Sequence, residues 1–303
     1  MTDDAGGAGT EGAGGAGAGD VGRDGWFEGL DTGDLDAARD AIADGCADDP
    51  GNWPTLAAEA GFASDGDDYY GRLHEATLHA TREAVRERER ADDRQLIHAI
   101  RAMDDASRIA NELAERVTEW AGATLDVDGA DGKLAGVEGA RKIADHEPEN
   151  PAERRLVELA RRARDLDDEA GELRAFIEEH TPAVAPNLSA LAGPVLAARL
   201  IALTGGLGEL SRKPSGTVQV LGAEDALFAH LRGQGSSPKH GIIYTHEYVR
   251  HTRPDERGSA ARALAGKLSI AARIDHYSGE RRPELDEELD ERIRRIRTRG
   301  EDE

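Results

Sequence analysis

Apolar residues recur every seven positions in two long stretches of this chain, and polar residues fill most positions between them. This spacing places an apolar stripe along a helix and is typical of a coiled-coil seam. The first seam consists of Leu96, Met103, Ala110 and Val117, together with Ala99, Ala106, Leu113 and Trp120. The second consists of Leu156, Ala163, Ala170 and Ile177, together with Leu159, Leu166, Leu173 and His180. We therefore predict two helices of about 28 residues, each about 40 Å long.

The stretch between the two seams is rich in residues that interrupt helices. It contains Gly122, Gly129, Gly132, Gly136 and Gly139, followed by Pro148 and Pro151. We expect the chain to reverse there, so that residues 89–181 form an antiparallel coiled-coil arm. Alanine at many seam positions lets helices approach closely, and a second copy of the chain would cover the remaining apolar surface in a homodimer. A monomeric hairpin packed on the chain's own domains is the alternative.

The segments that flank the arm have other patterns. Residues 1–23 are almost entirely Gly, Ala, Asp, Glu and Thr, and we expect a disordered tail. Residues 24–88 hold enough aromatic and aliphatic side chains for a small domain, either α/β or mainly helical. The charged tail, residues 283–303, carries four apolar residues at helical spacing, which indicates a short helix against the preceding domain or a frayed end. These four are Leu285, Leu289, Ile293 and Ile296.

Residues 182–282 contain proline-centred turns and short apolar runs. We expect Pro182 and Pro186 to break the second long helix, because proline lacks the backbone N–H that a helix interior needs. The apolar residues from Leu188 to Leu203 are predicted to form one core helix after that break. Residues 242–244, an apolar run after a proline-centred turn, look strand-like.

Charge distinguishes this segment from the rest of the chain. The whole chain has a net charge of −23, yet residues 186–282 contain 13 Lys and Arg against 8 Asp and Glu. A locally basic surface on an acidic protein indicates a polyanionic ligand, with phosphate as the obvious group. Only 5 of the 38 basic residues are lysines, a bias typical of proteins from a salt-rich cytoplasm. Intrinsic disorder also produces high net charge, but the regular helical spacing favours salt adaptation.

Several classes of site are disfavoured. The single cysteine, Cys46, excludes a disulfide framework and cysteine-based zinc fingers. His240, His246 and His251 share no helical face, and no catalytic pair stands out, so we predict no metal, no cofactor and no catalytic residue in this chain. Residues 205–208 read Gly-Gly-Leu-Gly but lack the Lys-Ser/Thr ending of a phosphate loop, which favours a helix end. No apolar run is long enough to span a membrane, so we expect a cytoplasmic protein without a membrane partner.

Two basic turns are candidate phosphate-binding elements. The first contains Arg212, Lys213 and Ser215, whose cations, hydroxyl and backbone N–H groups suit a phosphate backbone. The second contains Lys239 and His240 and could contact RNA or a partner protein. In both cases a plain solvated turn is the alternative.

Four more cations follow on a predicted helix: Arg257, Arg262, Lys267 and Arg273. Their spacing spreads them over more than one helical face, so we expect some of them to be structural. Arg273 is expected to pair with Asp275 inside the domain rather than to contact a ligand.

The order of motifs in the basic segment is familiar. It reads Pro186-Asn187-Leu188, Ala198-Arg199-Leu200-Ile201, Gly205-Gly206-Leu207, Pro214-Ser215-Gly216-Thr217-Val218-Gln219-Val220-Leu221-Gly222-Ala223-Glu224, Pro238-Lys239-His240-Gly241 and Ala271-Ala272-Arg273-Ile274-Asp275. This order of motifs resembles the Nop domain of box C/D ribonucleoprotein scaffold proteins and of one splicing factor. Asp104, Asn111 and Trp120 are similar to the start of the family's coiled coil, while the aromatic-proline motif that usually follows is replaced by residues 122–125.

The resemblance implies a fold and a function. It implies an all-helical Nop domain over residues 182–282, in a scaffold of the box C/D particle that directs 2′-O-methylation of rRNA or tRNA. In that family the N-terminal domain holds fibrillarin, the methyltransferase that brings S-adenosylmethionine, and the coiled coil dimerises. The Nop domain clamps a kinked guide RNA together with its kink-turn-binding ribosomal-like protein. A splicing-type Nop protein, a free-standing enzyme and a purely structural coiled-coil protein are the alternatives.

The resemblance also implies an RNA-facing element between the two basic turns. It adds Gln219, Gly222, Ala223, Glu224, Asp225, Leu227 and Phe228 to the candidate site. Two positions depart from the family, which usually has a lysine where Asp225 stands and often an arginine where Ala229 stands. Each departure removes an expected phosphate contact, and Asp225 adds repulsion.

Overall fold

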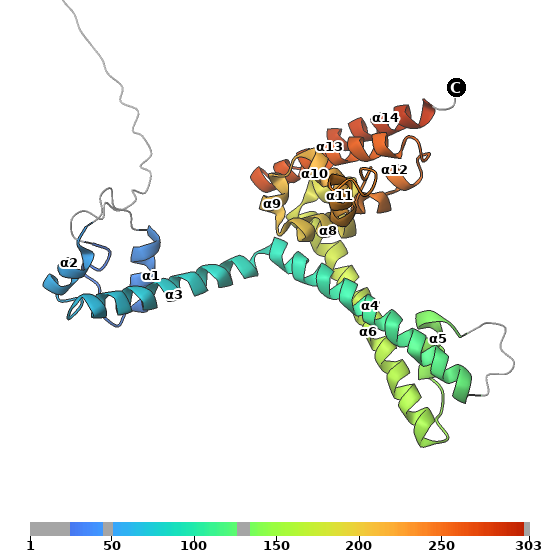
Figure 1. Ribbon diagram of the computed structural model, residues 1–303, viewed down its shortest axis with the longest axis horizontal. Helices are drawn as coiled ribbons and strands as arrows, with labels where there is room; N and C mark the ends of the chain where they lie inside the picture. The colour runs from blue at the N-terminus through green and yellow to red at the C-terminus, as the bar shows by residue number, and fades with distance from the viewer. Residues whose placement is uncertain (1–24, 45–50, 126–133, 300–303) are drawn as a thin grey trace, which may run out of the picture. The chain divides into compact units, whose positions relative to one another are not determined.

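A computed structural model describes residues 25–44, 51–125 and 134–299. Regular structure in these residues is helical, without a strand, which confirms the mainly α prediction for the described part of the chain (Figure 1). The chain divides into two compact units, residues 1–90 and 91–303. The predicted tail at residues 1–23, Cys46, Gly129 and Gly132 lie outside the described residues.

The N-terminal unit consists of α1 (Leu35–Asp44), α2 (Trp53–Glu59) and α3 (Gly66–Arg90), so its described part follows the helical alternative. Both α1 and α2 pack against α3. An aromatic cluster forms the core, with Trp26 edge-on to Phe62 and Phe27 stacked on Phe62 at 5.6 Å between ring centroids. The Trp26 indole N–H donates to the Tyr69 hydroxyl at 3.2 Å, which satisfies its one polar group.

The predicted arm is present in the second unit as α4 (Asp92–Thr124) and α6 (Pro151–Val184). Early residues of α4 share a buried cluster with late residues of α6, and late residues of α4 with early residues of α6, so the helices are antiparallel. Ala110 and Ala163 are fully buried, as expected where alanine allows close approach. Asn150 caps α6 by accepting from the backbone N–H groups of Ala152 and Glu153.

The reversal between these helices contains one element that the sequence pattern did not predict. This is α5 (Gly136–Ala144), which packs against both α4 and α6. A Cβ atom at Gly139 would lie 2.9 Å from the carbonyl carbon of Leu134, so this glycine permits a close approach rather than a turn.

Pro182 does not end the second arm helix, contrary to our prediction. The helix continues to Val184 and stops at Ala185, directly before Pro186. Pro182 removes a single backbone donor in the last turn, whereas Pro186 forces the residue before it out of the helical region. Ala185 accordingly has φ −144° and ψ 74°.

The apolar run from Leu188 to Leu203 also differs from the prediction, because it forms two helices instead of one. Gly193 has a left-handed φ of 78° and separates α7 (Pro186–Ala192) from α8 (Pro194–Thr204), with a bend of 117° between them. Leu203, expected in the core, is 49% exposed. No single described helix is long and apolar enough to span a membrane, and α7 with α8 passes that test only as a bent pair whose buried residues lie in the core.

Short elements complete this unit around one long helix. They are α9 (Leu207–Ser211), α10 (Ser215–Val220), α11 (Glu224–Leu231), η1 (Ile242–Thr245) and α12 (Glu247–Arg250), and the long helix is α13 (Arg257–Tyr277). The strand-like interpretation of residues 242–244 is wrong, because they form the 3-10 turn η1 and no strand lies among the described residues to pair with them. The last element, α14 (Glu284–Thr298), buries its four predicted apolar residues in the same core as α13. Of the two alternatives for this stretch, the packed helix is the one observed.

A buried polar cluster joins the two ends of the basic segment. The Asp275 carboxylate accepts from the backbone N–H groups of Asn187 and Leu188 at 3.0 and 2.8 Å, and so caps α7 from α13. The Asn187 side-chain amide donates a third hydrogen bond to the same carboxylate. The predicted pair of Asp275 with Arg273 is therefore not formed, because the Asp275 carboxylate is occupied by these three hydrogen bonds. Arg273 is structural in another way and donates to the Ser211 carbonyl at 3.1 Å.

The glycine pair at residues 205–206 ends α8, as the sequence analysis favoured. Gly205 has φ 90°, and the N–H groups of Gly205 and Gly206 both donate to carbonyls of the last helical turn. The N-terminus of α4 is fastened to this turn, since Asp93 accepts from the Leu207 N–H at 3.0 Å. Asp104 of α4 pairs with Arg199 of α8, so the arm and the helices after it share one unit.

Candidate nucleic-acid interface

The loop that carries the second basic turn is bound to α10 almost entirely through backbone groups. The N–H groups of Gly241 and Ile242 donate to the carbonyls of Gln219 and Leu221 at 2.8 and 2.7 Å. The Gln219 side-chain amide donates to the Lys239 carbonyl at 2.6 Å. A Cβ atom at residue 241 would lie 1.9 Å from the Leu221 carbonyl oxygen, so only glycine fits there. These contacts place Lys239 beside α10.

The connection from α10 to α11 is a glycine turn closed by an acidic side chain. Gly222 has φ 79°, and its N–H donates to the Glu224 carboxylate at 2.8 Å. Glu224 and Asp225 occupy the first turn of α11, where negative charge favours the helix N-terminus.

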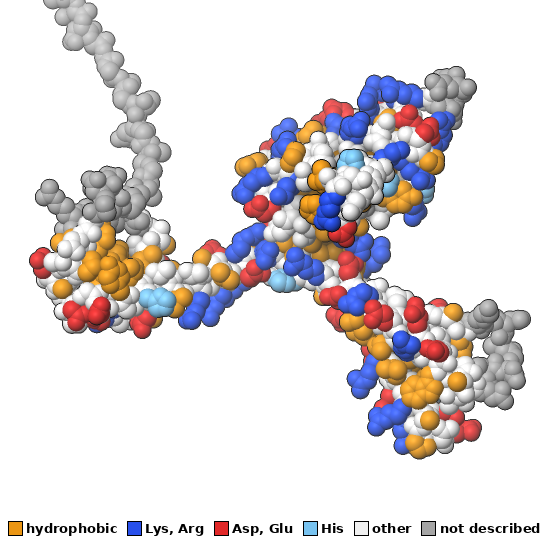
Figure 2. Space-filling model, viewed as in Figure 1, with side chains coloured by type: hydrophobic (Ala, Val, Ile, Leu, Met, Phe, Trp, Pro, Cys, Tyr) orange, Lys and Arg blue, Asp and Glu red, His pale blue; other side chains and the backbone are white. Residues whose placement is uncertain are grey.

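No residue of α11 is buried, although five of its eight residues are apolar. Phe228 is 52% exposed and Leu231 is 71% exposed. Apolar and basic side chains lie next to one another on the face of this unit that carries α11 (Figure 2). Exposed apolar side chains beside cations are typical of a surface that binds a partner.

A pocket of about 730 Å³ lies between α10, α11, the loop at residues 237–239 and the start of α13. It brings together Gln219, Leu227 and Lys239 from the predicted set with Ser259 and Arg262 of α13. We call it the α10–α11 pocket. Its lining combines an amide, three hydroxyls, two cations, apolar carbon and one carboxylate, Asp255, which is neutralised by its ion pair with Arg253 at 2.6 Å. Such a lining suits a sugar-phosphate backbone and an adjoining base.

The first basic turn lies elsewhere on α13. The Ser269 hydroxyl donates to the Lys213 carbonyl at 3.1 Å and fixes this turn. Ser269 is seven residues after Arg262, so the two turns are separated by roughly 10 Å along α13. The structure therefore does not bring the two basic turns into one pocket. Arg212 pairs with Glu209 at 2.8 Å, which neutralises part of the turn's charge.

Most cations on α13 are structural, as expected from their spacing. Arg257 donates to the Thr252 carbonyl at 3.0 Å and lies 5.4 Å over the Tyr244 ring. Lys267 pairs with Glu288 of α14. The guanidinium of Arg262 forms no hydrogen bond, ion pair or cation–π contact with a described residue, unlike the charged groups of Arg257, Lys267 and Arg273. Arg262 is thus the cation of α13 that is left to meet a ligand.

His240 stacks on Tyr244 at 4.6 Å between ring centroids. Burial lowers the pKa of His240, and the nearby cations Arg257 and Lys239 lower it further. The imidazole is therefore neutral at neutral pH, and the positive charge of this turn comes from Lys239. Among the described residues, no three His, Cys, Asp or Glu side chains are grouped to hold a metal ion.

Comparison with known proteins identifies the family. The model of the Nop family, described as "snoRNA binding domain, fibrillarin", matches residues 138–297, more than half of the chain. The chain belongs to the Nop family. An uncharacterized NOP5 family protein of Methanocaldococcus jannaschii is 33% identical over 271 residues, which cover 79% of this chain and 66% of that protein. Nucleolar protein 56 of Saccharomyces cerevisiae is 43% identical over 122 residues, 40% of this chain and 24% of that protein.

A solved structure supports the same assignment at the level of fold. The crystal structure of a fibrillarin/Nop5p complex contains a chain that matches 91% of this Nop protein with a TM-score of 0.50 and 26% identity. The match covers 99% of that chain. The Nop protein therefore spans almost all of the solved relative, about two thirds of the archaeal protein and about a quarter of the yeast protein.

Several of the family motifs in this Nop protein build the fold and do not face a ligand. Asn187 and Asp275 form the buried cap of α7, and Arg199 pairs with Asp104. Gly241 allows the backbone approach that sets Lys239 in place. The motifs at residues 214–224 and 238–241 do meet, at the α10–α11 pocket.

The two departures from the family pattern lie on α11. Asp225 is exposed in its first turn, and Ala229 is half-buried one turn later. The structure shows no basic side chain that replaces either of them on α11 itself, where His230 is the last-turn residue. Ser259 and Arg262 were not among the residues predicted for the site, because α13 comes next to α10 and residues 237–239 only in the folded chain.

Proposed function

We propose that this Nop protein is the RNA-binding scaffold of a box C/D particle that directs 2′-O-methylation of rRNA or tRNA. It acts as a non-catalytic subunit, and S-adenosylmethionine belongs to a separate fibrillarin-type methyltransferase. The observation that carries the proposal is the match of 91% of the chain to the fibrillarin/Nop5p complex structure. The α10–α11 pocket and the exposed side chains of α11 support it, since they supply cations, an amide and apolar surface on one face.

The proposed partners divide between the units. The N-terminal unit holds the methyltransferase, and Tyr70, Leu78 and Val85 of α3 are exposed apolar residues available for that contact. The C-terminal unit binds the kinked box C/D guide RNA together with a kink-turn-binding ribosomal-like protein. In this assignment Lys239 contacts phosphate, while Phe228 and Leu231 contact the partner protein or an unstacked base.

The arm is proposed to pair with a second copy. Its seam is largely filled within one chain, because all residues of the first heptad set in each helix are buried. The apolar side chains left exposed on the arm are Ile109 (37%), Trp120 (38%) and Phe176 (37%). We expect a homodimer in sedimentation, and the variant Trp120→Glu with Phe176→Glu to be monomeric. A monomeric unaltered protein at tens of micromolar would remove the dimer from the proposal.

Reconstitution tests the function. The full chain, a fibrillarin-type methyltransferase, the ribosomal-like protein and a box C/D guide RNA should together transfer methyl groups to a complementary target RNA, and omission of this chain should abolish the transfer. A chain that begins at residue 91 should still bind the RNA and ribosomal-like protein but fail to recruit the methyltransferase. If this shortened chain still bound the methyltransferase, the assignment of the N-terminal unit would be wrong.

A further inference from the structure

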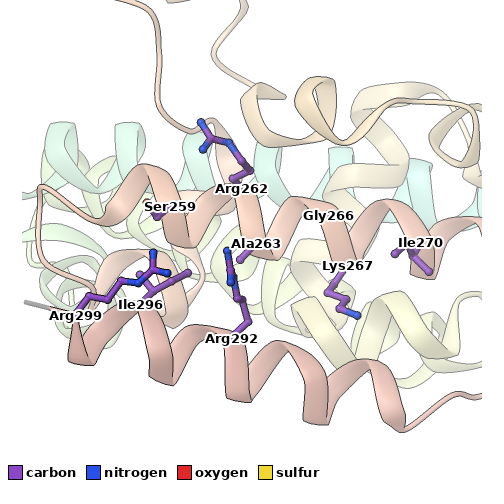
Figure 3. A pocket seen from close by; sticks show the side chains of 9 residues that line it. All are labelled: Ser259, Arg262, Ala263, Gly266, Lys267, Ile270, Arg292, Ile296 and Arg299. Carbon is purple, nitrogen blue, oxygen red and sulfur yellow. The ribbon is translucent and has the colours of Figure 1, made fainter.

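A second basic groove lies between α13 and α14. It has a volume of about 470 Å³ and shares only Ser259 and Arg262 with the α10–α11 pocket (Figure 3). Its nine lining residues are Ser259, Arg262, Ala263, Gly266, Lys267, Ile270, Arg292, Ile296 and Arg299. Four of the nine are basic and none is acidic, in a chain whose 61 acidic residues outnumber its 38 basic ones. A pocket without acidic lining is therefore a local exception that needs an explanation.

Three of its cations have no carboxylate partner in the described part of the chain. Arg262, Arg292 and Arg299 form no ion pair there, and only Lys267 is paired, with Glu288. Arg295, on the same helix but outside the groove, pairs with Glu291 at 3.1 Å. Like charges that converge without counter-charges repel one another, and a bound anion would relieve this repulsion.

The shape of the groove suits a chain of anions better than one ion. Arg292 and Arg299 are seven residues apart, so they lie on one face of α14 and about 10 Å from each other along its axis. On α13 the facing positions are small, with Ala263 and Gly266, and a Cβ atom at Gly266 would meet no atom within 4 Å. Small side chains on one wall and arginines on the other leave room for a ligand as bulky as a sugar-phosphate backbone.

Arg262 connects this groove with the α10–α11 pocket, because it lines both. In Figure 3, Arg292 and Lys267 extend into the space between the two helices, whereas the Arg262 guanidinium extends from the opposite side of α13. Arg262 therefore stands between Lys239 of the one site and Arg292 and Arg299 of the other, with its guanidinium on the side of α13 that faces away from α14. Two adjoining basic sites that share a cation favour one long polyanion over separate small ligands.

We propose that the α13–α14 groove is a second phosphate-binding site, which holds the backbone of the RNA where it continues past the α10–α11 pocket. This inference rests on the proposed RNA-binding function. The arginine guanidinium can donate two parallel hydrogen bonds to a phosphate, so Arg292 and Arg299 bind successive phosphates while Arg262 guides the strand between the two sites. The contacts are to the backbone and are independent of base sequence.

Two RNAs and one double variant test the groove. One RNA ends close to its kink-turn and the other continues as a longer strand; both carry the ribosomal-like protein. The full-length unaltered protein should bind the longer RNA more tightly and with a steeper log–log salt dependence. Arg292→Gln with Arg299→Gln should lower the slope for the longer RNA by roughly 1.4 to 1.8, for two lost contacts, and leave binding of the shorter RNA unchanged.

Matched controls separate charge from position and shape. Arg294→Gln with Arg295→Gln removes the same charge from α14 outside the groove and should not change the difference between the two RNAs. Gly266→Leu fills the groove without a change of charge and should weaken binding of the longer RNA only. Thermal unfolding of each variant shows whether the unit remains folded.

Three results would contradict the inference or its basis. If both double variants, the one inside and the one outside the groove, weakened binding of the longer RNA equally, the effect would come from overall charge and not from a binding site in the groove. A second contradicting result would come from polyglutamate as a probe. If Arg292→Gln with Arg299→Gln abolished polyglutamate binding, and neither RNA displaced polyglutamate from the unaltered protein, the groove would bind an acidic polypeptide and not RNA. If the unaltered protein bound not even the shorter RNA, the proposed function itself would fail, an outcome distinct from loss of the length effect alone.

Discussion

Two short helices of the C-terminal unit, α8 and α11, are both rich in apolar residues but differ completely in burial. Five residues of α8 are buried, including Leu200 and Ile201 at 0% exposure. None of the eight residues of α11 is buried. Burial of a large apolar side chain contributes about 1.5 to 3 kcal/mol to the free energy of unfolding. The buried side chains of α8 therefore stabilise the fold, whereas the exposed side chains of α11 make no such contribution in the free protein. Apolar content alone therefore does not identify the core, and the exposure of α11 supports the proposal that this helix meets a partner.

The largest expected effect comes from the buried helix. Leu200→Ala should lower the free energy of unfolding by about 2 to 5 kcal/mol, because it removes a fully buried side chain and leaves a cavity. Denaturant unfolding followed by far-ultraviolet circular dichroism measures this loss. A change below about 0.5 kcal/mol would show that α8 is not part of the core.

The matched change on the exposed helix should behave in the opposite way. Leu231→Ala should change stability by less than about 0.5 kcal/mol, because the side chain is already 71% exposed. Assembly with guide RNA and the ribosomal-like protein should weaken about tenfold, equivalent to about 1.4 kcal/mol. Unchanged assembly would mean that this end of α11 does not face a partner.

A smaller effect is expected from restoring the family's cations on α11. Asp225→Lys with Ala229→Arg should tighten RNA binding at low salt and steepen the log–log salt slope by roughly 1.4 to 1.8, for two added phosphate contacts. At high salt the variant and the unaltered protein should converge, because counterion release then contributes little. An unchanged slope would place residues 222–230 away from RNA.

The smallest effect concerns pH. Burial lowers the pKa of His246 below its ordinary value of 6.5, and its ring nitrogen accepts from the Tyr248 N–H at 3.1 Å, which caps α12. The unfolded chain therefore binds a proton at His246 at higher pH than the folded chain does. The stability that the neutral His246 contributes is present above about pH 6.5 and is lost as pH falls toward the lowered pKa. His240 shifts in the same direction. His246→Asn, which keeps a capping acceptor, should flatten the pH dependence of unfolding; an equally steep dependence would remove His246 as its source.

Sequence periodicity predicted the long helices, which bury one apolar stripe against a neighbouring helix. The first heptad set of each arm helix and the four apolar residues of α14 indicated burial correctly, because helical spacing is a local property. Trp120 and His180, which end the second heptad sets, are exposed instead. The capping of α7 by Asp275, 88 residues from Asn187, could not be predicted from spacing, since it depends on the tertiary fold. The same holds for Arg262, whose neighbours in the α10–α11 pocket come from three other segments.

The bend at Gly193 and the exposure of α11 show a second limit. A continuous apolar run predicted one helix through Leu203, but the left-handed φ of Gly193 divides the run, and Leu203 near the end of α8 is exposed. The signal was present in the Gly193-Pro194 pair, which favours a helix stop followed by a helix start. Of the residues that the resemblance to the Nop domain implied, Gln219, Leu227 and Lys239 line the α10–α11 pocket, and Ser259 and Arg262 of α13 were not among them.

Purification of the protein from its native cells, at the salt concentration of their cytoplasm, is the decisive experiment for the proposed scaffold function. We expect a methyltransferase that binds S-adenosylmethionine, a ribosomal-like protein and small guide RNAs to copurify with it in constant proportion. Copurification should depend on Lys239 and Leu231 for the RNA and on residues 24–88 for the methyltransferase. Recovery of the protein without RNA and without a methyltransferase would contradict the account.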